Sequence, residues 1–109
     1  MATTTTEGWT DSEQRVARQA FDLAYGRAIQ ELVQTVQQRA GSLSTPEQVW
    51  ALHDFLSIER HTMEGRFDFR LDGILFVFAS LVKDKLLQLT ELDGLAADKL
   101  AKINAMSRF

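Results

Sequence analysis

Two histidines lie close together in the sequence and are the first residues to consider as metal ligands. His53 and His61 are eight residues apart, which on a helix separates them by about 80° around the axis and about 12 Å along it. They cannot bind the same ion without a ligand from a third element. The sequence also lacks a Glu-x-x-His pair, the motif that supplies carboxylate-bridged di-metal bundles. We therefore expect no metal site and no cofactor.

A hydrolytic triad is the second possibility, because a serine lies one helical turn after the first histidine. Ser57 follows His53 by four residues, but Asp54 projects about 100° away from that histidine, so we expect it not to orient the imidazole. Glu59 and Glu64 are expected to be solvated on an exposed helix face. The chain has no cysteine to act as a nucleophile, and its glycines are too isolated for a phosphate-binding loop. These residues do not favour an enzyme.

The charge composition argues against a nucleic-acid partner. The 12 Lys and Arg residues are outnumbered by 15 Asp and Glu residues, which leaves a net charge of −3. Proteins that bind phosphate backbones present a clustered excess of positive charge instead. Acidic residues interrupt the arginines of the first helix, which we expect to form a solvated surface: Arg15, Arg18, Arg27 and Arg39.

The N-terminal residues and the apolar runs bear on localisation. The longest uninterrupted apolar run, Ile74 to Ala79, is far shorter than the ~20 residues that a membrane-spanning helix needs. The start of the chain is rich in threonine and has neither the basic nor the apolar region of a targeting signal. We expect a cytoplasmic protein without membrane insertion, with one helical domain over residues 1–109 and disorder in residues 1–10.

Apolar residues recur every three or four positions over residues 11–39, which predicts an amphipathic helix. Asp11 or Ser12 is expected to cap its start, and Gly41 to end it. Such a helix is about 43 Å long, whereas a compact domain of this size is about 34 Å across. Part of its apolar stripe would extend beyond the domain. Either the fold is elongated or a second copy covers the stripe, and a homodimer is the simpler explanation.

A second helix is predicted to start at Pro46. Thr45 is the expected N-cap, Pro46 occupies the first helical position, and Gln48 can complete a capping box. The helix is expected to run to about Met63 and to end near Gly65. A last helix is predicted to start at about residue 91, because apolar residues recur there at helical spacing.

The segment between these helices is ambiguous. Residues 66–71 alternate polar and apolar side chains, and Asp72-Gly73 then precedes a second apolar run, which is typical of a β-hairpin. A helix is also compatible, since a stripe from Leu71 through Leu75 and Phe78 continues at helical spacing. An isolated hairpin would lack sheet partners. The pattern favours the helix but leaves hairpin character in residues 66–78 open.

The second helix carries a crowded set of residues that suits the centre of an interface. Trp50 and Asp54 are one turn apart, His53 adjoins them, and Arg60 follows within two turns. Tryptophan and arginine are enriched where protein surfaces meet. We expect Asp54 and Arg60 to form charged hydrogen bonds, either within one chain or across the dimer, and Val49 to lie between subunits. The alternative is a core tryptophan with polar neighbours on the solvent side.

Several strings together resemble one known family over nearly the whole chain. They are Trp-Ala-Leu-His-Asp-Phe-Leu-Ser at 50–57, Arg60-His61, Ile-Leu-Phe-Val-Phe-Ala at 74–79 and Leu-Ala-Ala-Asp-Lys at 95–99. In order and spacing they resemble the cyanobacterial fluorescence recovery proteins. The Thr-rich start lies outside the resemblance. The resemblance implies an all-α, elongated helical homodimer with a two-helix stalk (residues 11–64) and a small C-terminal helical head (residues 65–109).

The resemblance also implies a function. Members of that family bind the photoactivated orange carotenoid protein, chiefly through its C-terminal domain, and speed its return from the red to the orange form. They promote its detachment from the phycobilisome on the thylakoid surface, so fluorescence recovers. No bond chemistry and no bound pigment are implied. Without the resemblance, the residues indicate a helical dimeric adaptor or regulator of an unidentified protein.

The resemblance assigns two groups of site residues. Positions matching Trp50, His53, Asp54 and Arg60 gather near the dimer interface of the family, and those matching Phe76 and Lys102 belong to the surface of the head that binds the target. Helix geometry agrees for Phe76, because a core-facing Leu75 turns the next side chain about 100° toward solvent.

Overall fold

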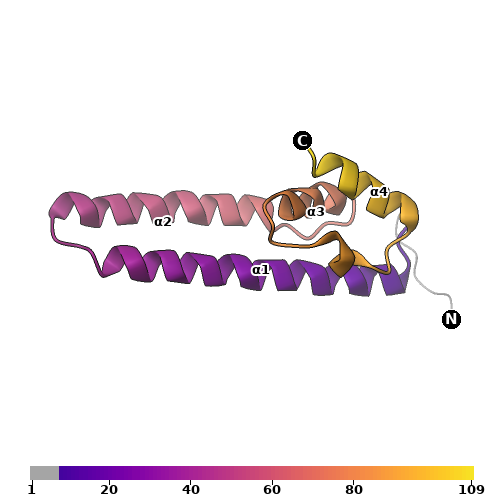
Figure 1. The fold of residues 1–109 in the computed structure, drawn as a ribbon, viewed down its shortest axis with the longest axis horizontal. Coiled ribbons are helices and arrows are strands. Elements are labelled where there is room, and N and C mark those ends of the chain that lie inside the picture. The colour runs from indigo at the N-terminus through magenta and orange to yellow at the C-terminus, as the bar shows by residue number, and fades with distance from the viewer. Residues whose placement is uncertain (1–7) are drawn as a thin grey trace.

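The computed structural model describes residues 8–109, which fold into four α-helices and one 3₁₀ helix. Helices α1 (Asp11–Ala40) and α2 (Pro46–Arg66) form a long antiparallel hairpin, and α3 (Ile74–Lys83), η1 (Leu89–Leu92) and α4 (Ala97–Met106) gather beside its open end (Figure 1). The molecule measures 60 × 31 × 17 Å, with a radius of gyration of 17.3 Å. A compact domain of this length would have about 13 Å. The predicted elongated, all-helical fold is confirmed.

Helix α1 begins with a capping box one residue earlier than predicted. The Thr10 hydroxyl accepts the backbone N–H of Glu13 at 3.0 Å, and the Glu13 carboxylate accepts the N–H of Thr10 at 3.1 Å. Thr10, rather than Asp11 or Ser12, is therefore the N-cap, because only Thr10 has a glutamate three residues later. Gly41 ends the helix as expected.

Helix α2 begins as the sequence predicts. The backbone N–H of Gln48 donates to the Thr45 hydroxyl, the Gln48 side chain accepts the N–H of Thr45, and both distances are 3.2 Å. Pro46 lies at the start of the helix, which continues to Arg66. None of its 21 residues is buried. A helix with this many apolar residues and no buried side chain indicates a surface that lacks its packing partner.

Residues 67–73 form neither the hairpin nor the helix predicted for them. They run in irregular conformation along α1, and within residues 8–109 no strand is present. Phe67 and Phe69 pack edge to face on Phe21, with ring centroids 5.5 and 5.3 Å apart, and Phe67 meets Tyr25 at 5.1 Å. The alternation of polar and apolar residues therefore reflects packing on a helix, not strand pairing.

Helix α3 confirms the helical prediction from residue 74 onward. Its buried face is formed by Ile74, Phe78 and Leu81, spaced four and three residues apart. This face differs from the predicted stripe, since Leu71 and Leu75 are only half-buried.

The last predicted helix is broken by a glycine. Gly94 has a φ of +112°, and a Cβ added there would lie 2.8 Å from Cγ2 of Val16 on α1. The backbone leaves the 3₁₀ helix η1, turns at Gly94 against α1, and starts α4 at Ala97. A single helix from residue 91 cannot form because a residue with this φ interrupts it.

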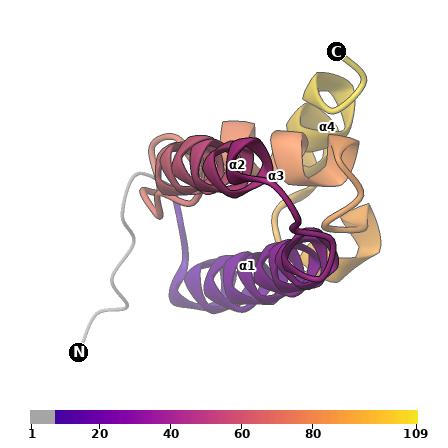
Figure 2. The ribbon, with the colours of Figure 1, turned by 90° about the vertical axis from the view of Figure 1, so that its left-hand side faces the viewer.

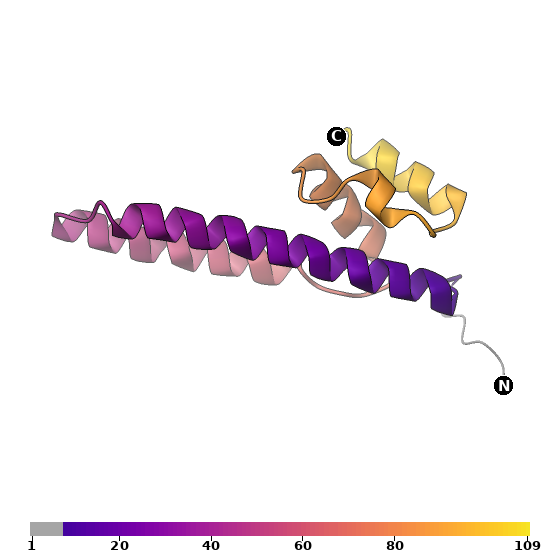
Figure 3. The ribbon, with the colours of Figure 1, turned by 60° about the horizontal axis from the view of Figure 1, so that its bottom comes forward.

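The core lies where the head meets the first half of α1. The head covers one side of the hairpin at its open end, and the closed end extends away uncovered (Figures 2 and 3). Much of the predicted disordered start, residues 1–7, lies outside the described residues. Trp9 corrects that prediction, because it is only 4% exposed. The buried apolar residues are Trp9, Ala17, Ala20, Phe21, Ala24, Ala28, Ile74, Phe78, Ala79, Leu81, Leu86, Leu87, Leu92, Leu95 and Ile103.

Candidate interaction surfaces

Helix α2 carries all five residues predicted for the dimer interface on its exposed surface. Val49 is 45% exposed and Trp50 65%, and His53, Asp54 and Arg60 are exposed as well. Spacings of four and seven residues place Val49, His53 and Arg60 within one narrow arc of the helix. The structure therefore brings these side chains to one face and leaves it open. The alternative of a core tryptophan at position 50 is wrong.

The polar residues of this face contact their neighbours along the helix. Nδ1 of His53 lies 3.3 Å from Oδ1 of Asp54, and the rings of Trp50 and His53 meet edge to face at 6.3 Å. Asp54 thus reaches the imidazole, contrary to expectation, because rotation about the side-chain torsions brings adjacent groups together. Nε of Arg60 donates to Glu64 at 3.3 Å. Within one chain, Arg60 pairs with Glu64 and Asp54 with His53, so the predicted bonds of Asp54 and Arg60 do not form there, and bonds across a dimer stay a prediction.

Helix α1 also leaves apolar side chains uncovered along the stalk. Tyr25 and Val33 are 44% and 41% exposed, and Ile29 and Val36 are half-buried. These four residues recur every three or four positions, so they form one stripe along α1. Both helices of the stalk therefore present apolar surface to solvent.

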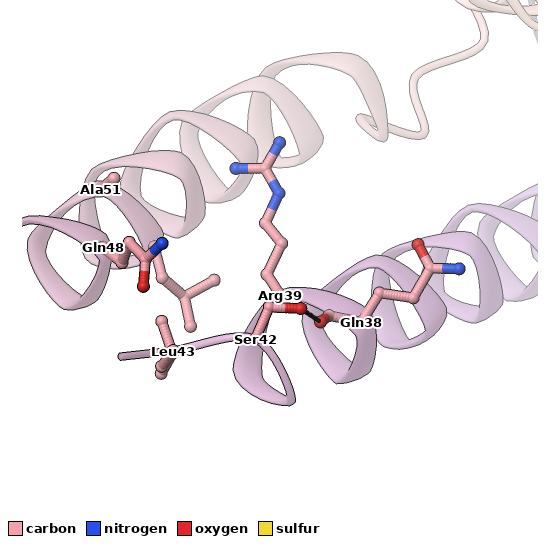
Figure 4. Close-up of a pocket in the computed structure, with 7 residues that line it drawn as sticks. Gln38, Arg39, Ser42, Leu43, Gln48 and Ala51 are labelled. Carbon is pink, nitrogen blue, oxygen red and sulfur yellow. Dashed lines mark hydrogen bonds between the residues drawn. The ribbon is translucent and has the colours of Figure 1, made fainter. Parts of the chain in front are cut away.

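The closed end of the stalk holds a hollow of about 360 Å³. Figure 4 shows Arg39 extending from α1 toward α2, and its guanidinium carbon lies 4.0 Å from the centroid of the Phe55 ring. The hydroxyl of Ser42 donates to the carbonyl of Gln38 at 3.1 Å. The hollow is lined by Gln38, Arg39, Ser42, Leu43, Gln48, Ala51 and Leu52. Amides and leucines of this kind can contact another protein, but they include no acid–base pair for catalysis.

A larger groove of about 680 Å³ lies on the head. We call it the head groove; it is lined by Gly8, Trp9, Leu71, Asp72, Leu75, Phe76, Asp98, Lys99, Lys102, Ala105 and Met106. The sequence-predicted target residues Phe76 and Lys102 therefore lie on the same groove, although 26 positions separate them. Phe76 is 70% exposed, as expected. Lys102 is exposed and makes no ion pair within residues 8–109.

Phe76 also borders a second hollow, of about 400 Å³. This hollow contains Phe109, which is 91% exposed, and Lys83, whose ammonium donates to the Phe109 carbonyl at 2.7 Å. Phe76 is thus a ridge between two depressions. An aromatic side chain in this position can insert into a cavity on a partner.

Three residues that the sequence did not single out as a site form a buried polar cluster beside the head groove. We call Trp9, Glu13 and Lys99 the clasp. The Lys99 ammonium donates to both carboxylate oxygens of Glu13 at 3.1 and 2.9 Å, and it lies 4.6 Å from the centroid of the Trp9 ring. Burial by itself raises the pKa of Glu13, but hydrogen bonds from Lys99 and two backbone N–H groups, with the charge of Lys99, lower it to about 2.

A second ion pair joins the head to α1 farther along the stalk. Arg27 donates to both oxygens of Glu91 at 2.8 and 2.7 Å, and to the carbonyl of Leu86 at 2.9 Å. Hydrogen bonds from Arg27 and from the backbone of Gln88 lower the pKa of Glu91 to about 2, and the pKa of Arg27 is raised in turn by that bond. The head is therefore attached to α1 at two charged points.

Metal sites and membrane-spanning helices are two further features that would bear on function. Within residues 8–109, no group of three or more His, Asp or Glu side chains is placed to hold a metal ion. Among the described helices, none combines the length and apolarity that crossing a bilayer requires.

Comparison with known proteins identifies the family. The model of one protein family, described as the photoprotection regulator fluorescence recovery protein, matches residues 9–107. The chain belongs to this family. The resemblance that the sequence strings indicated is confirmed, and the family is one of regulators.

Relatives agree with this assignment in sequence and in fold. The chain is 44% identical over 100 residues to the fluorescence recovery protein of Synechocystis sp., which covers 92% of both chains. The structure of the Fremyella diplosiphon fluorescence recovery protein matches with a TM-score of 0.90 at 46% identity, over 93% of this chain and 99% of that one. The Synechocystis structure matches with a TM-score of 0.89 at 44% identity, over the same shares of the two chains.

The clasp was missed because its members are distant in sequence. Trp9 falls in the start of the chain that was expected to be disordered. Glu13 and Lys99 are 86 residues apart, so no local pattern links them. The sequence gives no signal for Lys99 either, because a helix predicted from about residue 91 places Lys99 in its interior, whereas α4 starts only at Ala97.

Proposed function

We propose that this chain is a non-enzymatic regulator that binds the photoactivated orange carotenoid protein, mainly its C-terminal domain. It accelerates the return of that protein from the red to the orange form and promotes its detachment from the phycobilisome, which restores fluorescence. Its place of action would be the cytoplasm, near phycobilisomes on the thylakoid surface. The observation that carries this proposal is the family match over residues 9–107, and the exposed surfaces of the fold support it.

Phe76 and Lys102 are proposed as the target-binding residues. An aromatic ring that is 70% exposed on a well-packed helix is costly to leave in water unless a partner covers it. Lys102 supplies a positive charge on the same groove. An aromatic anchor beside a cation suits a partner surface that carries acids around an apolar patch.

The open face of the stalk is proposed to bind a second copy of the chain through Val49, Trp50, His53, Asp54 and Arg60. Helix α2 has 21 residues and is about 32 Å long. With α1 beside it, the stalk presents a face roughly 20 Å wide, or roughly 600 Å² per protomer. Two such faces bury about 1,200 Å² in total, which lies at the lower end of the range for stable specific interfaces, so a second stalk is large enough to form a dimer.

The proposed acceleration of the return to the orange form needs only binding and no bond chemistry. The return to the orange form is already downhill in darkness, so the regulator only has to lower its barrier. Binding must therefore favour the returning transition state over the red form. A rigid dimer that holds two separated domains of the target near each other reduces the entropy cost of their re-encounter.

The test is to mix the protein with light-activated carotenoid protein and to follow the colour change in darkness. The expected result is a recovery rate that rises with protein concentration and then saturates. Heat-unfolded protein at the same concentration serves as the control. Unchanged decay at excess folded protein would contradict the proposal and leave an adaptor for a different protein target.

A further inference from the structure

The clasp joins three parts of the chain, namely residues 8–9, the start of α1 and the first turn of α4. The Lys99 ammonium, on α4, donates to the carbonyl of Gly8 at 2.7 Å in addition to Glu13 on α1, and it lies over the ring of Trp9. The two charged side chains are only 13% and 8% exposed. Both charged groups are hydrogen-bonded to each other, and no buried side-chain nitrogen or oxygen of the described residues lacks a partner.

Glu13 also caps α4 from a distance. The N-cap residue of α4 is Ala96, whose side chain cannot accept a hydrogen bond, so its helix start has no local cap. The second carboxylate oxygen of Glu13 accepts the backbone N–H of Ala96 at 2.8 Å. A negative charge at this end of α4 also offsets the unfavourable position of Lys99 in the first turn.

The clasp forms one wall of the head groove. Trp9 and Lys99 line that groove together with the proposed target residues Phe76 and Lys102. Lys102 follows Lys99 by three residues, so both lysines lie on the same side of α4. The order of the first turn of α4 therefore sets where the Lys102 ammonium is placed.

We infer that Glu13 and Lys99 are positioning residues for the head groove: they order the start of α4 against α1, so that Phe76 and Lys102 are held in a binding arrangement before the target arrives. The inference rests on the function proposed above. A bound target then does not have to order this turn itself. Without the clasp, each binding event would include that ordering, and re-ordering even one backbone residue weakens affinity about tenfold.

The experiment compares Lys99→Met with Arg70→Met in the full-length protein. Both substitutions remove one positive charge from the head, but Arg70 forms an exposed pair with Asp68, with side-chain exposures of 75% and 52%. Lys99→Arg keeps the charge and is expected to rescue. If Lys99→Met does not fold by circular dichroism, Glu13→Gln takes its place, because it removes the charge and retains an acceptor oxygen.

Two measurements give the outcome. Dark recovery of the carotenoid protein is titrated to obtain a half-saturating concentration and a maximal rate, and amide exchange of residues 96–100 is followed by NMR. For Lys99→Met we expect a half-saturating concentration about tenfold higher, a nearly unchanged maximal rate and faster exchange at Ala96. Arg70→Met should change neither measurement.

The inference is overturned if Lys99→Met lowers the melting temperature but leaves the half-saturating concentration and the exchange at Ala96 as in the unmodified protein. It is equally overturned if Arg70→Met has the same effect as Lys99→Met. A failure of the proposed function is distinguishable, because the unmodified protein would then not accelerate recovery at all. In that case the exchange data still report whether the clasp orders α4.

Discussion

Lys99 and Lys102 lie one turn apart on α4, and their surroundings give them different roles. Lys99 is held by Glu13 and covered by Trp9, whereas Lys102 is exposed. On α3 the same contrast separates Phe78, which is fully buried, from Phe76, which is 70% exposed. Side chains that hold the head together are therefore distinct from those that can reach a partner, and each kind can be changed separately.

Phe76→Ala is expected to weaken target binding while the protein stays folded. Truncation of an aromatic anchor typically costs 2 kcal/mol or more, which corresponds to roughly 30-fold weaker binding. Titration of recovery rate against protein concentration measures this effect. Leu23→Ala, which truncates a 43% exposed side chain on α1, is the matched control. Normal binding by Phe76→Ala would place the docking surface elsewhere.

Lys102→Glu is expected to weaken binding in a salt-dependent way. The substitution replaces an attraction to the partner by a repulsion, and salt screens such interactions between exposed charges over about 10 Å at 0.1 M. The loss of affinity should therefore be greater at low than at high ionic strength, as measured by titration at 20 and 300 mM salt. A loss that is independent of salt would argue against an electrostatic role for Lys102.

At the scale of elements, the close approach of the Gly94 backbone to the Val16 side chain fixes how the head packs on α1. Gly94 meets Val16 where no Cβ fits, and beyond the turn at Gly94 the side chain of Lys99 on α4 reaches Glu13 on α1. The charged contacts of Glu13 and Arg27 attach the same elements at two further points. These three contacts attach the head to α1 in addition to the aromatic packing of Phe67 and Phe69 on Phe21.

Gly94→Ala is expected to destabilise the protein. The positive φ is strained for alanine, and the new Cβ would collide with Val16, so the free energy of unfolding should fall by about 1–3 kcal/mol. Urea unfolding followed by circular dichroism measures this loss. Gly26→Ala is a suitable control, because no atom would contact its Cβ and alanine favours a helix. An unchanged urea midpoint for Gly94→Ala would show that the close contact between Gly94 and Val16 does not require a glycine.

Acid is expected to loosen the attachment of the head. The pKa values of Glu13 and Glu91 are lowered from 4.5 to about 2 on folding, so their stabilisation is complete above about pH 5 and is lost as the pH falls toward 2. Each carboxylate should lose on the order of 2 kcal/mol between pH 7 and pH 3. Urea unfolding at several pH values measures the slope. Glu13→Gln and Glu91→Gln should each flatten it, and a slope as steep as that of the unmodified protein in both variants would contradict this assignment.

The whole molecule is a rod with its core at one end. Its longest extent is 60 Å, and the buried residues lie where the head meets α1, while α2 buries none. A helix of this length that buries none of its residues leaves its apolar side chains in contact with water. The proposed second copy would supply the missing partner for the stalk.

Val49→Glu is expected to convert the proposed dimer into monomers. A carboxylate buried without a partner costs several kcal/mol, which is sufficient to dissociate a micromolar dimer. Light scattering after size-exclusion chromatography measures the mass. Leu23→Glu is the matched control, because Leu23 is 43% exposed, close to the 45% of Val49, and lies on α1 outside the proposed interface residues. A Val49→Glu protein that remains dimeric at low micromolar concentration would move the interface elsewhere.

The sequence by itself determined the features that depend on neighbours along the chain. Thr45 and Gln48 form their capping box within four residues, Gly41 ends α1, and the helical period predicts which side of α3 holds Phe76. The residue strings around Trp50 also indicate the family without reference to any tertiary contact. These features were predictable because hydrogen bonds and side-chain spacing within one helix involve residues only three or four positions apart.

The tertiary structure decided the features that depend on contacts between distant segments. The alternating residues 67–71 could pair as a strand or pack on a helix, and only the presence of Phe21 beside them selects packing. The close contact with Val16 requires a glycine at position 94, and this glycine interrupts the last predicted helix. Pairing with Lys99 allows Glu13 to be buried. At these positions the neighbouring residues in the sequence favour no single conformation or contact. Burial of aromatic rings and pairing of buried charges decide the outcome, and both require partners that the chain supplies only when it is folded.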